Sequence, residues 1–112
     1  MKYNVPTYDE IGILLDNDKN KAGIISKKLN KKIQEAKSRN ISVDLTLAFV
    51  RKNYEKILGI GMCDYTGLQF DDINYPTFER IDASKPYTDD NTIIIGSVIN
   101  QTKGCFENKL AN

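Results

Sequence analysis

"TFERIDASKPYTDDNTIIIGSVINQTKG", residues 77–104, is the stretch that decides the fold of this 112-residue chain. It starts with residues that favour a strand at 77–82, and the turn formers Ser, Pro, Asp and Asn follow them. The apolar, β-branched run after Asn91 predicts a second strand, and a short helix is expected beyond it. This order predicts a β-hairpin followed by a helix, within an α+β protein.

The residues before this stretch predict helices. A short helix is expected at residues 8–16 and a longer one at residues 19–39, with one of the turn residues 16–18 as its N-cap. The longer helix carries four apolar residues at helical spacing, which predicts one buried stripe. These residues are Ile25, Leu29, Ile33 and Ala36.

A third helix is predicted to begin near residue 44, with Ser42 or Asp44 as its N-cap. The glycines at 59–61 are expected to end it, because glycine readily adopts the left-handed conformation after a helix. After it, Gly67 is expected at a turn that leads into a short strand. The expected inner face of the third helix consists of Leu47, Val50, Tyr54 and Ile57.

The length of 112 residues predicts a single domain. The net charge of +1 conceals two unlike parts. Residues 1–60, the helical and lysine-rich part, carry 12 Lys or Arg against 7 Asp or Glu, a balance of +5. Residues 61–112 carry 4 against 8, a balance of −4. This asymmetry suits a phosphate-binding surface beside a cation site, or docking onto another protein through charge.

The predicted helix at 19–39 is strongly basic, with eight Lys or Arg and a single acid. Such a row of cations can follow a nucleic-acid backbone, because each neutralised phosphate releases counterions. A solvated helix face is the alternative interpretation. The cations assigned to the nucleic-acid interface are Lys27, Lys28, Lys31, Lys32, Lys37, Arg39 and, after the second predicted strand, Lys103.

No apolar run approaches the ~20 residues that a membrane span needs, and the first ten residues show no signal-peptide pattern. We therefore expect a cytoplasmic protein with no membrane association. Two cysteines, Cys63 and Cys105, are too few for a tetrahedral zinc site, so no structural zinc is expected. Both cysteines are instead interpreted as small buried hydrophobic residues.

Three segments in order resemble a known family. They are "KKIQEAKSRNISVDLTLAFVRKNYEK", "CDYTG" and "PTFERIDASKPYTDDNTIIIGSVINQTKG". Together they are similar to the small phage-type HNH endonucleases, and the likeness covers roughly residues 28–105. The resemblance implies N-terminal helices followed by a ββα-metal (HNH-like) hairpin and helix, with residues 61–112 forming that module.

The resemblance also implies roles for single residues. Glu79 stands at the family's acidic position and Arg80 at its histidine position. Asn91 matches the asparagine that braces the loop between the strands, and Asn100 matches the helix position that binds or adjoins the metal. The implied catalytic residues are therefore Glu79, Arg80 and Asn100.

The expected cofactor is Mg or Mn, because both metals prefer hard oxygen ligands. The expected metal ligands are Glu79 and Asn100, with Asp82 where the strand bends. The chain has no histidine, and Arg80 cannot accept a proton near neutral pH, although it could clamp a phosphate. The base would then be Asp82, Glu79 or a metal-bound water, and we expect slow cleavage.

Three functions are compatible with the sequence. The first is a divalent-metal-dependent DNA endonuclease of HNH type, acting in the host cytoplasm if it is phage-encoded. The second is a catalytically inactive HNH-derived protein that binds a host protein, such as a phage-encoded inhibitor of a host enzyme or defence system. The third is a non-cleaving DNA-binding protein. A purely structural interpretation of the hairpin places Phe78 and Ile81 in the core and the charged residues 79, 80 and 82 in surface ion pairs.

Overall fold

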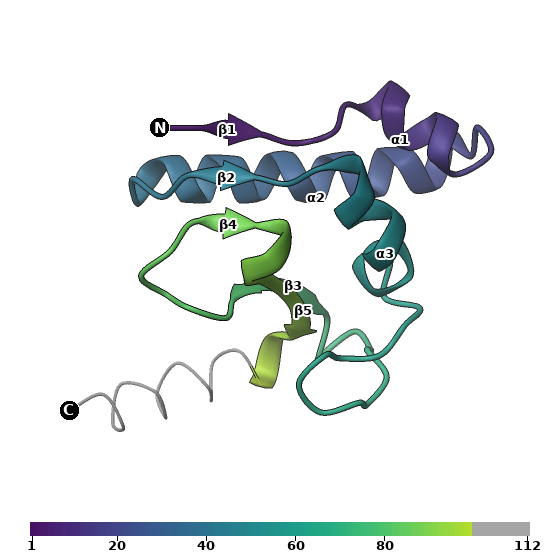
Figure 1. Ribbon diagram of the computed structural model, residues 1–112. Helices are drawn as coiled ribbons and strands as arrows, with labels where there is room; N and C mark the ends of the chain where they lie inside the picture. The colour runs from purple at the N-terminus through teal and green to yellow at the C-terminus, as the bar shows by residue number, and fades with distance from the viewer. Residues whose placement is uncertain (100–112) are drawn as a thin grey trace.

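The computed structural model describes residues 1–99, and Figure 1 shows the arrangement of their helices and strands. The described part combines α-helices, a parallel sheet and an antiparallel hairpin, which confirms the predicted α+β class. The elements are β1 (Tyr3–Asn4), α1 (Tyr8–Leu14), α2 (Lys19–Ser38), β2 (Val43–Asp44), α3 (Leu47–Ile57), β3 (Pro76–Arg80), β4 (Tyr87–Thr88), the 3-10 turn η1 (Asp89–Asn91) and β5 (Thr92–Gly96).

The first two helices begin at side-chain caps. Thr7 accepts a hydrogen bond from the backbone of Glu10, and the Glu10 carboxylate accepts one from Thr7, which makes a capping box for α1. Asp18 accepts a hydrogen bond from the backbone of Lys21 and caps α2, as the turn residues predicted. The predicted apolar stripe of α2 is confirmed, because all four of its members are buried together with Ala22.

Three two-residue strands form a parallel sheet in the order β1-β2-β4, which runs alongside α2 in Figure 1. Val43 pairs with Tyr3 on one side and Tyr87 on the other. The predicted N-cap of α3 at Ser42 or Asp44 is therefore wrong, because Asp44 belongs to β2 and the cap is Thr46. Val43 is fully buried, so this short strand contributes to the core.

Helix α3 buries a face that only partly matches the prediction. Val50 and Ile57 are buried as expected, whereas Leu47 and Tyr54 are only partly buried against the core. Phe49 and Asn53 occupy the buried positions between them. Helix α3 ends at Ile57, and Gly59 follows with a φ of +83°, which confirms the predicted glycine terminus.

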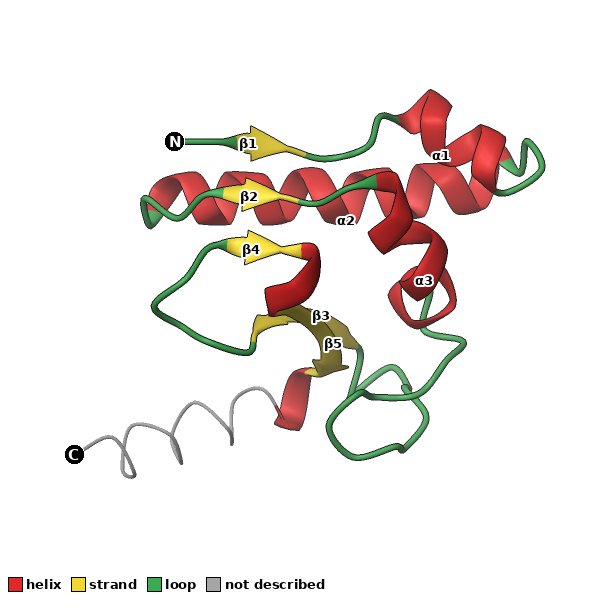
Figure 2. Cartoon of the chain, viewed as in Figure 1, coloured by secondary structure: helices red, strands yellow, loops and turns green. Residues whose placement is uncertain are grey.

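Strands β3 and β5 form the antiparallel hairpin, drawn in yellow and labelled β3 and β5 in Figure 2. Phe78 faces Ile94 in the register, and both are buried. The predicted strand at 77–82 stops at Arg80, because the backbone bends into the loop there. Ile81 is 58% exposed, so the expectation that it fills the core is wrong.

Several predicted residues lie outside the described part of the chain. They are the expected metal ligand Asn100, the expected DNA contact Lys103, and Cys105, which was expected to be buried. Within residues 1–99, none of the helices has the length and apolar character that crossing a bilayer requires.

Candidate functional site

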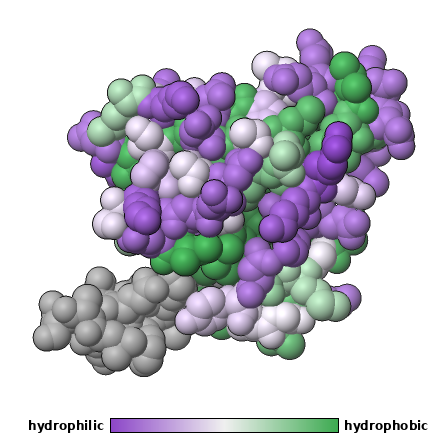
Figure 3. Space-filling view, viewed as in Figure 1, coloured by the Kyte–Doolittle hydropathy of each residue, from purple (hydrophilic) through white to green (hydrophobic). Residues whose placement is uncertain are grey.

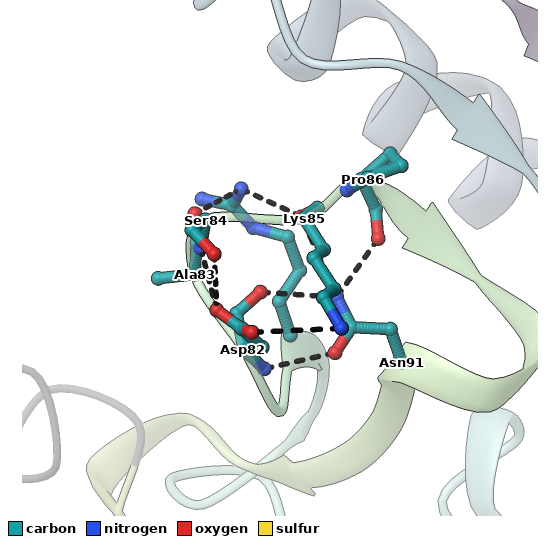
Figure 4. A network of polar contacts seen from close by, with 7 residues as sticks. Asp82, Ala83, Ser84, Lys85, Pro86 and Asn91 are labelled. Carbon is teal, nitrogen blue, oxygen red and sulfur yellow. Dashed lines mark hydrogen bonds and ion pairs between the residues drawn. The ribbon is translucent and has the colours of Figure 1, made fainter.

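The loop between β3 and β4 is held by the side chain of Asn91, which is only 8% exposed. Its Oδ1 accepts a hydrogen bond from the backbone N–H of Asp82 at 2.8 Å. Its Nδ2 donates to the carbonyl oxygens of Asp82 at 3.0 Å, Pro86 at 2.9 Å and Lys85 at 3.4 Å. Figure 4 shows these contacts converging on one amide. The Asn91 side chain therefore joins residues at both ends of the loop between β3 and β4.

Asp82 is engaged in a turn of the same loop. Its Oδ1 accepts hydrogen bonds from the Ser84 hydroxyl at 2.6 Å and from the Ser84 N–H at 2.9 Å. Its Oδ2 lies 4.0 Å from the ammonium of Lys85, and both side chains are exposed. The hydroxyl and N–H of Ser84 lower the pKa of the Asp82 carboxyl, against a smaller desolvation effect and with help from the charges of Lys85 and Arg80.

The side chain of Arg80 also donates hydrogen bonds within this loop. Its Nη1 donates to the carbonyl oxygens of Ala83 at 2.7 Å and Lys85 at 3.0 Å. Its Nε is buried and has no hydrogen-bond partner among residues 1–99. The guanidinium carbon lies 5.3 Å from the ring centroid of Tyr87, a cation–π distance. Arg80 therefore contributes to loop structure at the position that the resemblance gives to a histidine.

The Tyr87 ring contacts both Arg80 and Lys32, for which the sequence predicted different functions. It is 4% exposed and pairs through β4 with Val43 of β2. The ammonium of Lys32, expected to bind DNA, lies 5.3 Å from the same ring centroid as Arg80 does. Tyr87 therefore connects α2 to the hairpin, and sequence reasoning missed it. Its place between Pro86 and Thr88, in a strand-forming stretch, was the one signal for a buried aromatic ring.

Glu79 is the expected acidic ligand, and it lies on β3 opposite Ile93. Successive strand residues project to opposite faces, so Glu79 and Arg80 diverge. The Oε1 atom of Glu79 accepts a hydrogen bond from the backbone N–H of Arg80 at 2.9 Å. No hydrogen bond or ion pair within residues 1–99 engages its other oxygen, and the residue is only partly buried. One carboxylate oxygen is thus available to a metal ion.

The rest of the expected metal site is incomplete in the part that the structure describes. No group of three Asp, Glu or Cys side chains there lies close enough to hold a metal ion. Asp82 commits one oxygen to Ser84, and Asn100 lies outside the described residues. Glu79 fits a role as one ligand of Mg or Mn, and the chain would need Asn100 to supply another.

Three of the six expected DNA contacts on α2 already have partners inside the protein. Lys28 donates to the carbonyl oxygen of Ile57 at the end of α3, at 2.7 Å. Lys32 forms an ion pair with Glu35 at 3.0 Å besides its contact with Tyr87. Lys37 lies over the ring of Tyr3, with 5.3 Å to its centroid. The contacts with Ile57, Tyr87 and Tyr3 attach α2 to the rest of the fold, whereas the pair of Lys32 with Glu35 lies within the helix.

The other three of these cations are exposed; Lys27 and Lys31 belong to α2, and Arg39 is its C-cap. Within residues 1–99 none of them forms a hydrogen bond or ion pair through its side chain. Lys27 and Lys31 are one helical turn apart, so they share the outward face of α2. The free part of the expected DNA interface is thus smaller than the sequence suggested, and it is centred on these two lysines.

Cys63 lies in the turn before the hairpin and is 2% exposed. Its Sγ accepts a hydrogen bond from the Tyr65 N–H at 3.4 Å. Burial raises the pKa of the thiol, but the Thr66 hydroxyl and the backbone of Gly96, Thr66 and Tyr65 together lower it below its ordinary value. The thiol is free, and its burial agrees with the expectation of a small buried residue.

Two cavities among residues 1–99 lie away from the loop that Asn91 closes. One cavity of about 400 Å³ opens between α1, α2 and α3, where Lys21, Arg51 and Tyr54 line it. A second, beneath the hairpin between Lys28 and Phe78, has about 10 Å³ and is no larger than a single water.

The fold and the site define an α+β protein with a hairpin whose loop is closed by a buried asparagine. Comparison with protein-family models, curated proteins and solved structures gives no match for this chain. The function must therefore be inferred from the residues themselves.

Proposed function

We propose that this chain is an HNH-like DNA endonuclease that depends on Mg or Mn and cleaves slowly. The observation that supports this proposal most is the buried amide of Asn91, which closes the hairpin loop through four hydrogen bonds. The resemblance to HNH endonucleases gives this position the same task. The finer fold, a ββα-metal unit, is part of the proposal, and its helix residue Asn100 lies outside the described chain.

In this proposal, Glu79 and Asn100 hold the divalent cation. Glu79 suits this role because one of its carboxylate oxygens is free and the residue is partly exposed. The Asp82 carboxylate instead accepts a hydrogen bond from Ser84 and stabilises the loop. A bound Mg or Mn would neutralise charge on the scissile phosphate. No histidine is present to remove a proton from water, and the loss of a general base costs roughly 10²–10⁴ in rate. We therefore expect slow cutting.

The proposed DNA contacts are the exposed cations of α2. Lys27, Lys31 and Arg39 can approach phosphates without breaking a contact inside the protein. Lys28 and Lys32 would have to leave Ile57 and Glu35 to do so. We expect the first set to contribute to DNA affinity and the second set to contribute mainly to stability.

A second candidate is an HNH-derived protein that no longer cleaves and binds a host protein or DNA instead. The contacts of Arg80 favour it, because Nη1 already donates to the carbonyls of Ala83 and Lys85, which leaves fewer guanidinium donors for a phosphate. The two candidates share the fold and differ in whether the chain cleaves DNA and in the partner that it binds.

The test is plasmid nicking by the purified full chain with Mg or Mn, with and without a chelator. We expect metal-dependent nicking that falls at least about 100-fold in Glu79→Gln and in Asn100→Ala. The matched control is Glu55→Gln, an exposed carboxylate of α3, which should leave the rate unchanged. Nicking that is absent, or equal in all variants, would reject the endonuclease and leave the second candidate.

A further inference from the structure

The segment between α3 and β3, residues 58–75, presents large apolar side chains to solvent. Six of them are more than half exposed, and exposed apolar groups gathered on one segment mark interaction sites. Figure 3 shows pale and green atoms at the lower right, where Figure 1 draws this segment as a wide loop. We call these six side chains the apolar loop surface: Ile60, Met62, Tyr65, Leu68, Ile73 and Tyr75.

The first part of this loop is held in one conformation by hydrogen bonds. The N–H of Cys63 donates to the carbonyl of Leu68 at 2.8 Å, and Gly67 donates to Cys63 at 2.9 Å with a φ of +72°. Asp64 exchanges backbone and side-chain hydrogen bonds with Ile94 of β5, each 2.9 Å long, and forms an ion pair with Lys56. The exposed side chains between these anchors therefore project from a fixed frame.

The second part of the loop is fixed by the chain that follows β5. Ser97 donates from its N–H to the carbonyl of Tyr75 and from its hydroxyl to the carbonyl of Ile73, at 2.8 and 2.9 Å. Asn74 accepts a hydrogen bond from Val98, which is itself 46% exposed. A preorganised surface loses little conformational entropy when a partner binds to it.

The charge of this segment indicates what kind of partner fits. Residues 58–75 contain three carboxylates and no Lys or Arg. Asp71 and Asp72 are exposed beside Ile73, while Asp64 is paired with Lys56. Such a surface repels nucleic-acid phosphates and anionic lipids, and attracts cations.

We propose that the apolar loop surface binds another protein through a patch that combines apolar and basic side chains. Apolar contact would supply most of the affinity, and Asp71 and Asp72 would select cationic neighbours. A second copy of this chain is a poorer fit, because the basic outward face of α2 offers Ile24, at 40% exposure, as its large apolar contact. The inference goes beyond DNA cleavage and does not depend on it.

The test titrates the ¹⁵N-labelled full chain with a short amphipathic peptide of leucine and lysine, and separately with its leucine and glutamate counterpart. We expect the amide signals of residues 60–75 to shift with the lysine peptide and not with the glutamate peptide. Leu68→Ser and Asp72→Lys should each weaken binding by about tenfold or more. The matched control is Ile13→Ser, at an apolar residue of α1 that is 75% exposed against 65% for Leu68, which should bind as the parent does.

Several outcomes would overturn the proposal. They are no binding at millimolar peptide, equal binding of both peptides, or signal shifts confined to α1 and α2. Self-association that grows with protein concentration and disappears in Leu68→Ser would assign the surface to a second copy instead. All the substituted side chains are exposed, so the variants should fold, and Asp72→Lys changes charge without removing an apolar contact.

Discussion

Asn91 and Asp82 exchange two hydrogen bonds across the hairpin loop, one in each direction. The Asp82 N–H donates to Asn91 Oδ1 at 2.8 Å, and Asn91 Nδ2 donates to the Asp82 carbonyl at 3.0 Å. An amide pairs in this way with a backbone unit because it offers a donor and an acceptor side by side. The buried Asn91 amide therefore holds the loop together with the Arg80 guanidinium, which donates to Ala83 and Lys85.

Replacing this amide should destabilise the whole fold. Asn91→Ala leaves one N–H and up to three carbonyls without their partner in a part-buried loop. We expect the free energy of unfolding to fall by about 2–4 kcal/mol, measured by urea denaturation. Asn20→Ala, at an exposed position of α2, is the control and should change it by less than about 0.5 kcal/mol. Equal stability of both variants would contradict the bracing role.

The Asp82 carboxyl should titrate below its ordinary pKa of 3.8, chiefly because the Ser84 hydroxyl and N–H stabilise its ionised form. A carboxyl whose pKa is lowered by folding contributes stability that is complete above the unfolded value and is lost as pH falls through the folded value. The ¹³C signal of the carboxyl, followed by NMR from neutral to acidic pH, measures this pKa. Ser84→Ala should raise the midpoint towards 3.8, and an unchanged midpoint would show that Ser84 is not the cause.

The sequence could predict the elements whose signals are local. The stripe of α2 follows the helical period over many residues, and turn formers between two β-branched runs indicate a hairpin. The sheet β1-β2-β4 could not be predicted, because two-residue strands have no measurable period and Val43 pairs with residues about 40 positions away on either side. The false N-cap at Asp44 follows from the same absence of signal.

The candidate site was predictable to a similar extent. The bracing role of Asn91 came from the resemblance, and the described geometry is consistent with it. The structural role of Arg80 could not be predicted from the sequence. Its partners are the backbone carbonyls of Ala83 and Lys85, and the positions of these carbonyls depend on the conformation of the loop. The sequence also could not predict which lysines of α2 lack a partner inside the protein, because Lys28 and Lys32 contact residues of α3 and β4 that are distant in the sequence.

Lys28 should make the free energy of unfolding depend on pH in the alkaline range. Burial lowers the pKa of its ammonium below 10.5, so the unfolded chain binds this proton more tightly than the folded chain does. Stability contributed by this residue therefore rises as pH increases from the folded pKa to 10.5. We expect the difference in unfolding free energy between the parent chain and Lys28→Met to grow in favour of the parent over that interval. A difference that is independent of pH would contradict the effect of burial.

The salt dependence of DNA binding should separate the free lysines from the engaged ones. Each phosphate contact contributes about 0.9 to the slope of log K against log salt concentration. Lys27→Gln combined with Lys31→Gln should therefore lower that slope by about 1.8 without loss of stability. Lys2→Gln, which alters an exposed lysine immediately before β1, is the control and should leave the slope unchanged. Equal slopes in all three proteins would remove α2 from the interface.

Arg80→Lys should distinguish a loop brace from a phosphate clamp. A lysine keeps the positive charge but cannot donate from one planar group to the carbonyls of Ala83 and Lys85 while lying over Tyr87. We expect the free energy of unfolding to fall by about 1–3 kcal/mol, measured by urea denaturation. Arg51→Lys, at an exposed position of α3, is the matched control and should lie within about 0.5 kcal/mol of the parent chain. If Arg80→Lys instead leaves stability unchanged and lowers only nicking or DNA affinity, Arg80 acts on phosphate and its loop contacts are incidental.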